Sequence, residues 1–203
     1  MAAGRPRKFD DDELLDRAVD LVWREGPLAL SLNEIATQLG TAKPALARRF
    51  GGKDDFIAAV LKRYHERIDG PVQAALADAK SLEGVARAYL NTYQAALSVK
   101  PVGPQTGCLL AATTEACATQ RGTVLAATIQ SLNERTKSGL IGALERVGAD
   151  EIDRLAGYLY GQSVALAFLS RSGADAEVLS DFVERALAGV LNDARTTGSA
   201  NDS

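Results

Sequence analysis

The sequence predicts an all-α protein with a small N-terminal domain of three helices and a larger helical C-terminal domain. Three observations support this fold class: apolar residues recur at helical spacing, Ala is abundant, and the alternation of β-branched residues that marks strands is missing. With 203 residues, 46% of them hydrophobic, the chain is long enough to bury a sizeable core.

The chain begins with a charged segment. Residues 1–8 are expected to form a flexible basic arm, and residues 9–53 the three-helix domain. The first helix of this domain is expected over residues 10–25, with acidic residues in its first turn, where the helix dipole favours them. Gly26-Pro27 is expected to stop this helix.

The next two helices are marked by caps and a glycine turn. Ser31 and Glu34 form a predicted capping box for a helix over residues 32–39, because each side chain can bond the other residue's backbone N–H. Thr41 is expected to cap the third helix, over residues 42–50.

The C-terminal domain is expected over residues 54–193 and contains only helices and loops. Its first helix is expected to stop at Gly70-Pro71, because proline lacks the N–H donor that a helix interior needs. The remaining elements are two helices in 71–98 broken near Lys80-Ser81, a loop over 100–107, helices over 108–120, 123–147, 151–171 and 175–193, and a disordered tail over 194–203.

Several functional classes are disfavoured by composition. No run of about 18 apolar residues is present and the N-terminus is charged, so we expect a cytoplasmic protein with no membrane partner. Cys108 and Cys117, nine residues apart, would lie on opposite faces of one helix and could not form a disulfide. His65 is the only histidine and is expected to be solvated or partly packed on its helix. We therefore expect no metal site, no cofactor and no enzyme activity.

A cluster of positive charge lies within this acidic chain of net charge −3. Residues 41–53 contain four basic residues and no acidic one. Leu46 and Phe50, four residues apart, must share one helix face, so Arg48 and Arg49 are expected to point outward. A short basic helix after a glycine turn predicts a helix-turn-helix motif, whose second helix enters the DNA major groove. The alternative interpretation is a charged face exposed only to solvent.

The predicted partner is therefore double-stranded DNA. Arginine suits this role because its planar fork can pair with guanine O6 and N7, while lysine, the basic arm and a helix N-terminus can meet phosphates. The residues expected to contact DNA are Arg5, Arg7, Ser31, Thr41, Lys43, Pro44, Ala45, Ala47, Arg48, Arg49 and Lys53.

Residues 29–36 and 50–56 resemble the DNA-binding domain of TetR/AcrR-type transcriptional regulators. The shared pattern is a Ser or Thr cap, an Ile-Ala pair, a turn glycine, then Leu and Phe followed by Lys and an acid, and the resemblance covers roughly residues 9–65. It implies an all-α homodimer whose C-terminal domain binds a small molecule that releases the DNA. The chain departs from the family at Ala47, where Tyr is usual, and at Ala42, where Ser or Thr is frequent.

Two apolar stripes lie on the last two predicted helices. The resemblance implies that these helices pair with their copies as a four-helix dimer interface, which would place two recognition helices about 34 Å apart, or a multiple of that, on an inverted repeat. The alternative is that the stripes face the core of one chain. They comprise Val178, Leu179, Phe182, Val183, Ala186, Leu187, Val190 and Leu191, and Ile152, Leu155, Ala156, Leu159 and Tyr160.

The small-molecule site implied by the resemblance lies between the middle helices, around residues 56–170. Each candidate could instead be an ordinary core or surface residue, because ligand pockets contain few polar groups. The candidates are Tyr64, Tyr89, Tyr93, Cys108, Glu115, Gln162 and Phe168.

Cys108 has a further interpretation. It would begin a helix, where the dipole favours a thiolate, and some members of the family that respond to electrophiles or oxidants have a similar Gly-Cys-Leu stretch. The hypothesis is a reactive sensor thiol, and its alternative is a small buried apolar residue. For the whole chain, the expected function is a ligand-responsive repressor, and the alternative is a helical small-molecule-binding or thiol-redox sensor protein without DNA contact.

Overall fold

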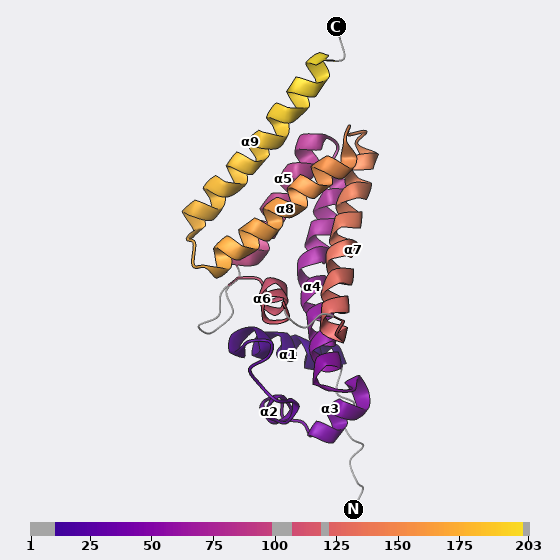
Figure 1. Cartoon of the computed structure of the whole chain (residues 1–203), viewed down its shortest axis with the longest axis vertical. Helices are drawn as coiled ribbons and strands as arrows, with labels where there is room; N and C mark the ends of the chain where they lie inside the picture. The colour runs from indigo at the N-terminus through magenta and orange to yellow at the C-terminus, as the bar shows by residue number, and fades with distance from the viewer. Residues whose placement is uncertain (1–10, 99–106, 119–121, 201–203) are drawn as a thin grey trace, which may run out of the picture.

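The computed structural model describes residues 11–98, 107–118 and 122–200, and over these ranges it contains nine helices and no strand (Figure 1). The predicted all-α class is therefore confirmed. The helices are α1 (Asp11–Glu25), α2 (Leu32–Gln38), α3 (Lys43–Phe50), α4 (Lys53–Asp78), α5 (Leu82–Ser98), α6 (Leu109–Ala116), α7 (Val124–Arg146), α8 (Ile152–Arg171) and α9 (Ala176–Ala200).

The first three helices form a small unit at one end of an elongated molecule (Figure 1). Buried Val19 and Val22 of α1, Ile35 of α2 and Leu46 of α3 join its core. Glycine makes the turn between α2 and α3, because Gly40 has φ +69°, a left-handed conformation that other residues seldom adopt. The core therefore fixes the angle at which α3 leaves α2.

Helix α4 is longer than the sequence predicts. It continues through Gly70-Pro71 to Asp78, so the expected stop there is wrong. Gly70 and Pro71 lie on the exposed side of the helix, while Ile68, Val72 and Leu76 continue its buried face. Burying each such side chain is worth about 1.5–3 kcal/mol. Together these side chains offset the roughly 3 kcal/mol that an interior proline costs.

The C-terminal domain is a helical bundle built around α4. Helix α7 runs beside α4, and α5 and α8 complete this layer, with α9 outermost (Figure 1). Short α6 lies near the junction with α1. The expected break near Lys80-Ser81 is present between α4 and α5.

Two predicted boundaries differ from the structure. Helix α6 ends at Ala116, earlier than the expected 120, and residues 99–106, which hold most of the predicted loop, lie outside the described residues. Helix α9 continues to Ala200, so the disordered tail predicted from residue 194 is wrong as far as 200. No proline interrupts this segment, and Asp193-Ala194-Arg195 is compatible with a helix.

The apolar stripe of α9 mostly faces the chain's own core. Its buried members, packed with α5 and α8, are Leu179, Val183, Ala186, Leu187 and Val190. Most of this stripe is therefore covered by other helices of the same chain and is not exposed for contact with a second copy. Exposed large apolar side chains on α8 and α9 are instead Tyr158, Val164, Phe168 and Val178. No helix in the described ranges is both long enough and apolar enough to span a bilayer.

Candidate nucleic-acid interface and ligand cavity

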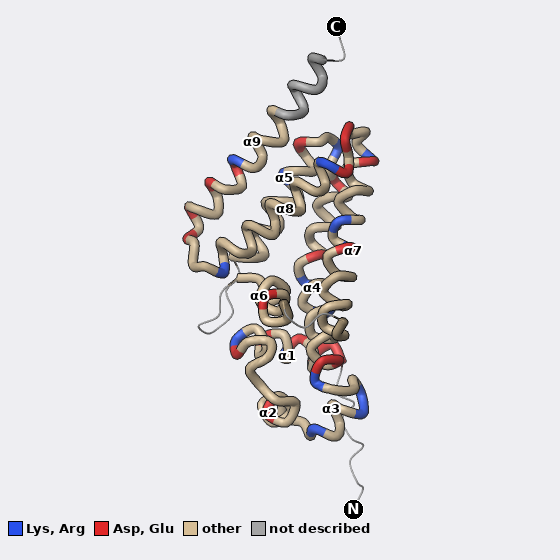
Figure 2. The backbone as a smooth tube through the Cα atoms, viewed as in Figure 1, with Lys and Arg blue, Asp and Glu red and all other residues tan. Residues whose placement is uncertain are grey.

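Helix α3 is displayed outward by an apolar backing. Leu46 is 2% exposed, and the Phe50 ring packs edge-on against Phe56 of α4 with centroids 5.2 Å apart. The opposite side of α3 is exposed, and Figure 2 shows its basic positions at the end of the molecule away from α9. The exposed residues of α3 are Lys43, Pro44, Ala47, Arg48 and Arg49, whereas Ala45, expected to point away, is half-buried.

The start of α3 differs from the prediction. Its N-cap is Ala42, which has no side-chain oxygen to accept a hydrogen bond, and Thr41 does not cap it. Thr41 instead lies in the turn, where its backbone N–H donates to the Ala36 carbonyl at 2.9 Å. The Ala45 and Leu46 N–H groups both donate to the Ala42 carbonyl, and Pro44 has no N–H, so these three residues leave no open backbone donor in the first turn of α3.

Ser31 begins α2 through the predicted capping box. The Ser31 N–H donates to the Glu34 carboxylate at 2.7 Å, and the Glu34 N–H donates to the Ser31 hydroxyl at 3.3 Å. These bonds lower the pKa of Glu34, with the backbone bond from Ser31 the largest cause. The Ser31 hydroxyl is therefore already engaged in shaping the motif.

Arg49 is not free, contrary to the expectation. Its guanidinium forms an ion pair with Asp11 of α1 and lies 5.9 Å from the centre of the Phe50 ring. The reason is the packing of α1, whose acidic first turn comes next to the end of α3. Within the described part of the chain, Arg48 is exposed and forms no ion pair. Arg48 is thus the arginine of α3 that is available to a partner.

Lys53 and the arm stay predictions as DNA contacts. The Lys53 ammonium donates to the Leu28 carbonyl at 3.0 Å, which ties the start of α4 to the segment between α1 and α2. Arg5 and Arg7 lie outside the described residues.

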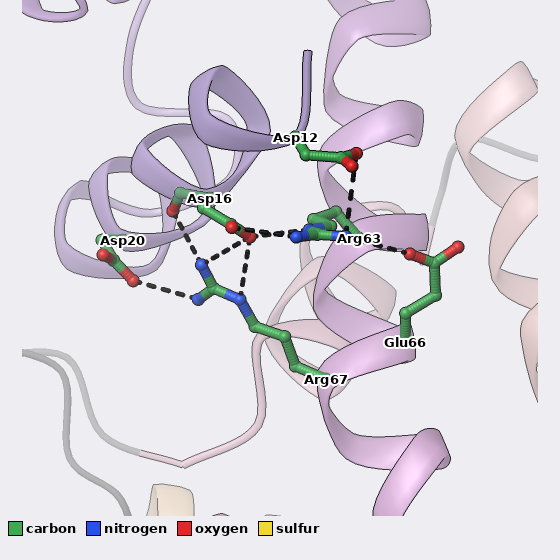
Figure 3. A network of polar contacts seen from close by, with 6 residues as sticks. All are labelled: Asp12, Asp16, Asp20, Arg63, Glu66 and Arg67. Carbon is green, nitrogen blue, oxygen red and sulfur yellow. Dashed lines mark hydrogen bonds and ion pairs between the residues drawn. The ribbon is translucent and has the colours of Figure 1, made fainter. Parts of the chain in front are cut away.

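A network of ion pairs fixes α1 on α4 (Figure 3). Arg63 Nε and Nη2 donate to the two Asp16 carboxylate oxygens at 2.6 and 2.9 Å. Arg67 contacts the same carboxylate at 2.9 Å and Asp20 at 3.2 Å. The bond from Arg63 is the largest cause that lowers the pKa of Asp16 to about 2. The N-terminal unit is thereby held to the long helix that enters the C-terminal domain.

A cavity of about 310 Å³ lies among α4, α5, α6, α7 and α8. Of the residues predicted to contact a ligand, Tyr64, Tyr93, Cys108, Glu115 and Phe168 line it. Two predictions are not met: Gln162 lies outside the lining, and Tyr89 is buried behind it, with its hydroxyl 2.9 Å from Ser163. The further lining residues are His65, Ile68, Leu110, Ala111, Thr114, Asn133, Thr136, Tyr160, Ser163, Val164 and Ala167.

His65 is buried, which corrects the expectation of a solvated or partly packed residue. It is 4% exposed, and its Nε2 lies 2.9 Å from the Thr136 hydroxyl of α7. Burial lowers its pKa, against the opposing effect of Asp69. The sequence did contain a signal, because His65 falls at helical spacing with the apolar residues Leu61 and Ile68.

The polar wall of the cavity is connected from helix to helix. The Tyr89 and Tyr93 rings of α5 lie 5.0 Å apart, and His65 Nε2 of α4 lies 2.9 Å from the Thr136 hydroxyl of α7. The Ser163 hydroxyl of α8 lies 2.9 Å from the Tyr89 hydroxyl of α5. Burial is the main cause that raises the pKa of both tyrosines, so their hydroxyls stay protonated donors.

Cys108 does not have the properties of a thiolate. Burial raises its pKa, which is opposite to the direction that the start of α6 was expected to give. Cys117 is also buried and its pKa is raised for the same reason. Both thiols are free, as expected. The geometry therefore favours the interpretation of Cys108 as a small buried residue.

The cavity and the N-terminal unit meet at Tyr64. The Tyr64 hydroxyl accepts a hydrogen bond from the Leu109 N–H at 3.1 Å, and its ring packs edge-on against Trp23 of α1 at 5.2 Å. The Trp23 indole N–H donates to the Gly107 carbonyl at 2.9 Å. Helix α1 is thus bonded directly to the segment that begins α6, a wall of the cavity.

Comparison with known proteins identifies the N-terminal unit. Residues 14–60 match the family described as bacterial regulatory proteins, tetR family. The HTH-type transcriptional repressor ComR of Escherichia coli is 37% identical over 87 residues, which cover 42% of this chain and 41% of that protein. The N-terminal unit thus matches the TetR family. An uncharacterized HTH-type transcriptional regulator of Mycobacterium tuberculosis is 30% identical over 106 residues, which cover 48% of this chain and 44% of that one.

Solved structures extend the likeness to the fold of most of the chain. A TetR-family regulator from Streptomyces coelicolor matches with a TM-score of 0.77 and 20% identity, over 91% of this chain and 95% of that one. A cysteine mutant of the TetR-family regulator CifR, complexed with 26-base-pair operator DNA, matches with a TM-score of 0.75 and 24% identity over 91% and 98%. At these sequence identities the structural likeness shows the fold alone. The chain spans less than half of the length of the curated relatives that it matches.

Metal-ligating side chains do not cluster in the part of the chain that the structure describes. No three His, Cys, Asp or Glu side chains there come together as metal ligands.

Proposed function

We propose that this regulator binds double-stranded DNA in the cytoplasm as a homodimer, and that a small molecule in the cavity releases it from an inverted-repeat operator. The observation that carries the proposal is α3: a short basic helix, backed by Leu46 and Phe50, with an exposed outer face. A helix of this kind fits the major groove. The family match to residues 14–60 supports the same role.

The roles within α3 follow from its contacts. Arg48 is the proposed base-contacting residue because it is exposed and is not held by an acid of the described chain. The exposed Lys43 side chain is the proposed phosphate contact, which would replace the tyrosine and hydroxyl absent at Ala47 and Ala42. Arg49 must exchange Asp11 for DNA before it contributes.

Dimerisation is supported by apolar side chains that the single chain leaves exposed. Phe168 is 64% exposed, Val164 50% and Val178 47%. Gly157 and Gly161 of α8 have open space where a side chain would be, so another helix could approach closely. A second copy packed on α8 and α9 would cover these groups.

Control by a small molecule is supported by the contact between the cavity and α1. A ligand that displaces Tyr64 or α6 would act on Trp23 through the ring contact and the Gly107 hydrogen bond. Release then requires that the ligand binds more tightly to the conformation in which the two copies of α3 no longer match the groove.

The test compares two arginine variants on a duplex containing the DNA that flanks the protein's own gene. Arg48→Ala is expected to weaken binding by about tenfold or more, because one good arginine–base contact is worth about 1–3 kcal/mol. Arg87→Ala on α5, which removes the same charge from a side chain 43% exposed, should leave affinity unchanged. Circular dichroism confirms that both variants are folded. Equal affinity of the two variants refutes the assignment of α3, and no binding to any such duplex favours a sensor protein without DNA contact.

A further inference from the structure

The charge of the ligand can be inferred from the groups that surround the cavity. No Lys or Arg is among the described residues that line it, so an anionic group would find no cation there. The carboxylate of Glu115 is already paired with Arg171 at 3.1 Å and is 68% exposed, which places it at the mouth. An ion taken from water into such a cavity would lose its hydration without gaining a partner, which is strongly unfavourable.

The polar groups of the wall are mostly engaged with one another. Tyr64 accepts from Leu109, and His65 is bonded to Thr136. The Ser163 hydroxyl donates to the Tyr160 carbonyl at 2.8 Å, and that of Thr114 to the Leu110 carbonyl at 2.8 Å. Burial also lowers the pKa of His65, which favours its neutral form. The wall therefore presents a neutral, internally satisfied surface.

Asn133 is different from these residues. It lines the cavity from α7 and is half-buried, and its side-chain amide has no hydrogen-bond partner within the described residues. The same lining contains the aromatic side chains of Tyr93, Tyr160 and Phe168. An amide presents both a donor and an acceptor, so it can bind a hydroxyl, carbonyl or amine of a neutral molecule.

We infer that the effector is a neutral, largely apolar aromatic molecule with a single hydrogen-bonding group that Asn133 binds. The inference rests on the proposed ligand-responsive function and names the class of ligand for the same cavity. The volume of about 310 Å³ lies at the small end of the range for ligand pockets, which favours a compact molecule of two or three rings.

The experiment measures ligand binding to the full-length protein without DNA, so its result is independent of operator binding. The fluorescent probe is N-phenyl-1-naphthylamine, which is neutral and carries one N–H. Its competitors share one ring system and differ in charge: 1-naphthalenemethanol is neutral, 1-naphthoate is anionic and 1-naphthylmethylamine is cationic. We expect saturable probe binding and displacement by the alcohol at a concentration about tenfold or more below that of either ion.

Two variants locate the site. Asn133→Leu should weaken binding of the alcohol about threefold to tenfold, which is the usual effect of one lost neutral hydrogen bond. The probe should still bind to this variant. Gln162→Leu on α8, outside the lining, is the matched control and should change neither. Ala111→Phe fills part of the cavity and should weaken the binding of both the probe and the alcohol. Probe binding that is retained in Asn133→Leu would show that the cavity of that variant is intact. Stronger displacement by the acid or the amine, no saturable probe binding, or equal effects of the Asn133 and Gln162 variants would overturn the inference.

Discussion

Asp16 provides a quantitative test of how the DNA-binding unit is held to the rest of the molecule. Its carboxylate accepts hydrogen bonds from both Arg63 and Arg67 of α4, and its pKa falls from 3.8 to about 2. At 1.36 kcal/mol per pKa unit this difference corresponds to about 2.5 kcal/mol, which is an upper bound. The Asp16 side chain is 37% exposed, and screening by solvent reduces the value to about 1 kcal/mol.

Asp16→Asn should therefore lower the melting temperature at pH 7 by about 2–4 °C, the usual effect of 1 kcal/mol in a chain of this size. Because the folded pKa is depressed, the contribution is complete above the ordinary carboxyl pKa of 3.8 and is lost as the pH falls towards 2. Thermal unfolding followed by circular dichroism at pH 7, 5 and 3 measures the difference from wild type, which should be equal at pH 7 and 5 and smaller at pH 3.

Glu66→Gln is the matched control for this prediction. It removes the same charge from a carboxylate that is 56% exposed and lies 3.7 Å from Arg63, so its effect should be close to zero. If Asp16→Asn is no more destabilising than Glu66→Gln, or if its effect is as large at pH 3 as at pH 7, then the network does not hold α1 on α4 in the way described.

Three further predictions concern packing and the thiols. Leu46→Ala should destabilise the protein by about 2–5 kcal/mol in urea unfolding and abolish DNA binding, because it removes the backing of α3. Gly107→Ala should lower the melting temperature more than Gly122→Ala, since both glycines have positive φ but only the first would bring a Cβ within 2.7 Å of the Arg171 backbone; equal effects would contradict this. In a Cys117→Ser variant, Cys108 should react with Ellman's reagent at pH 8 about tenfold or more slowly than after denaturation, and equal rates would restore the sensor hypothesis.

Most helices could be predicted from sequence because their signals are local. The capping box at Ser31 and Glu34 and the left-handed glycine at Gly40 depend only on residues a few positions apart. Pro71 shows the limit of this reasoning. Whether a helix continues through proline depends on the tertiary burial of Val72 and Leu76, which a local pattern does not contain.

The two candidate sites were predictable to different degrees for the same reason. The outward face of α3 followed from the spacing of Leu46 and Phe50, whereas the partner of Arg49 lies on another helix, whose packing angle brings Asp11 close. In the cavity, Tyr89 and Tyr93 are one turn apart on α5, yet only Tyr93 lines it. Which of two residues on one helix lines the cavity depends on how five helices pack around it.

Tyr64 explains how occupancy of a neutral cavity could be transmitted without any charged ligand. Its ring forms part of the lining, its hydroxyl holds the N-terminus of α6, and its edge packs on Trp23 of the DNA-binding unit. A compact apolar ligand that moves this one ring would disturb both contacts together, because close-packed interiors do not absorb such a shift locally. The Asp16 network opposes the same movement by clamping α1 to α4. The stability of that clamp and the affinity for the ligand should therefore be linked, since release requires the ligand to outweigh the contacts that keep α1 in place.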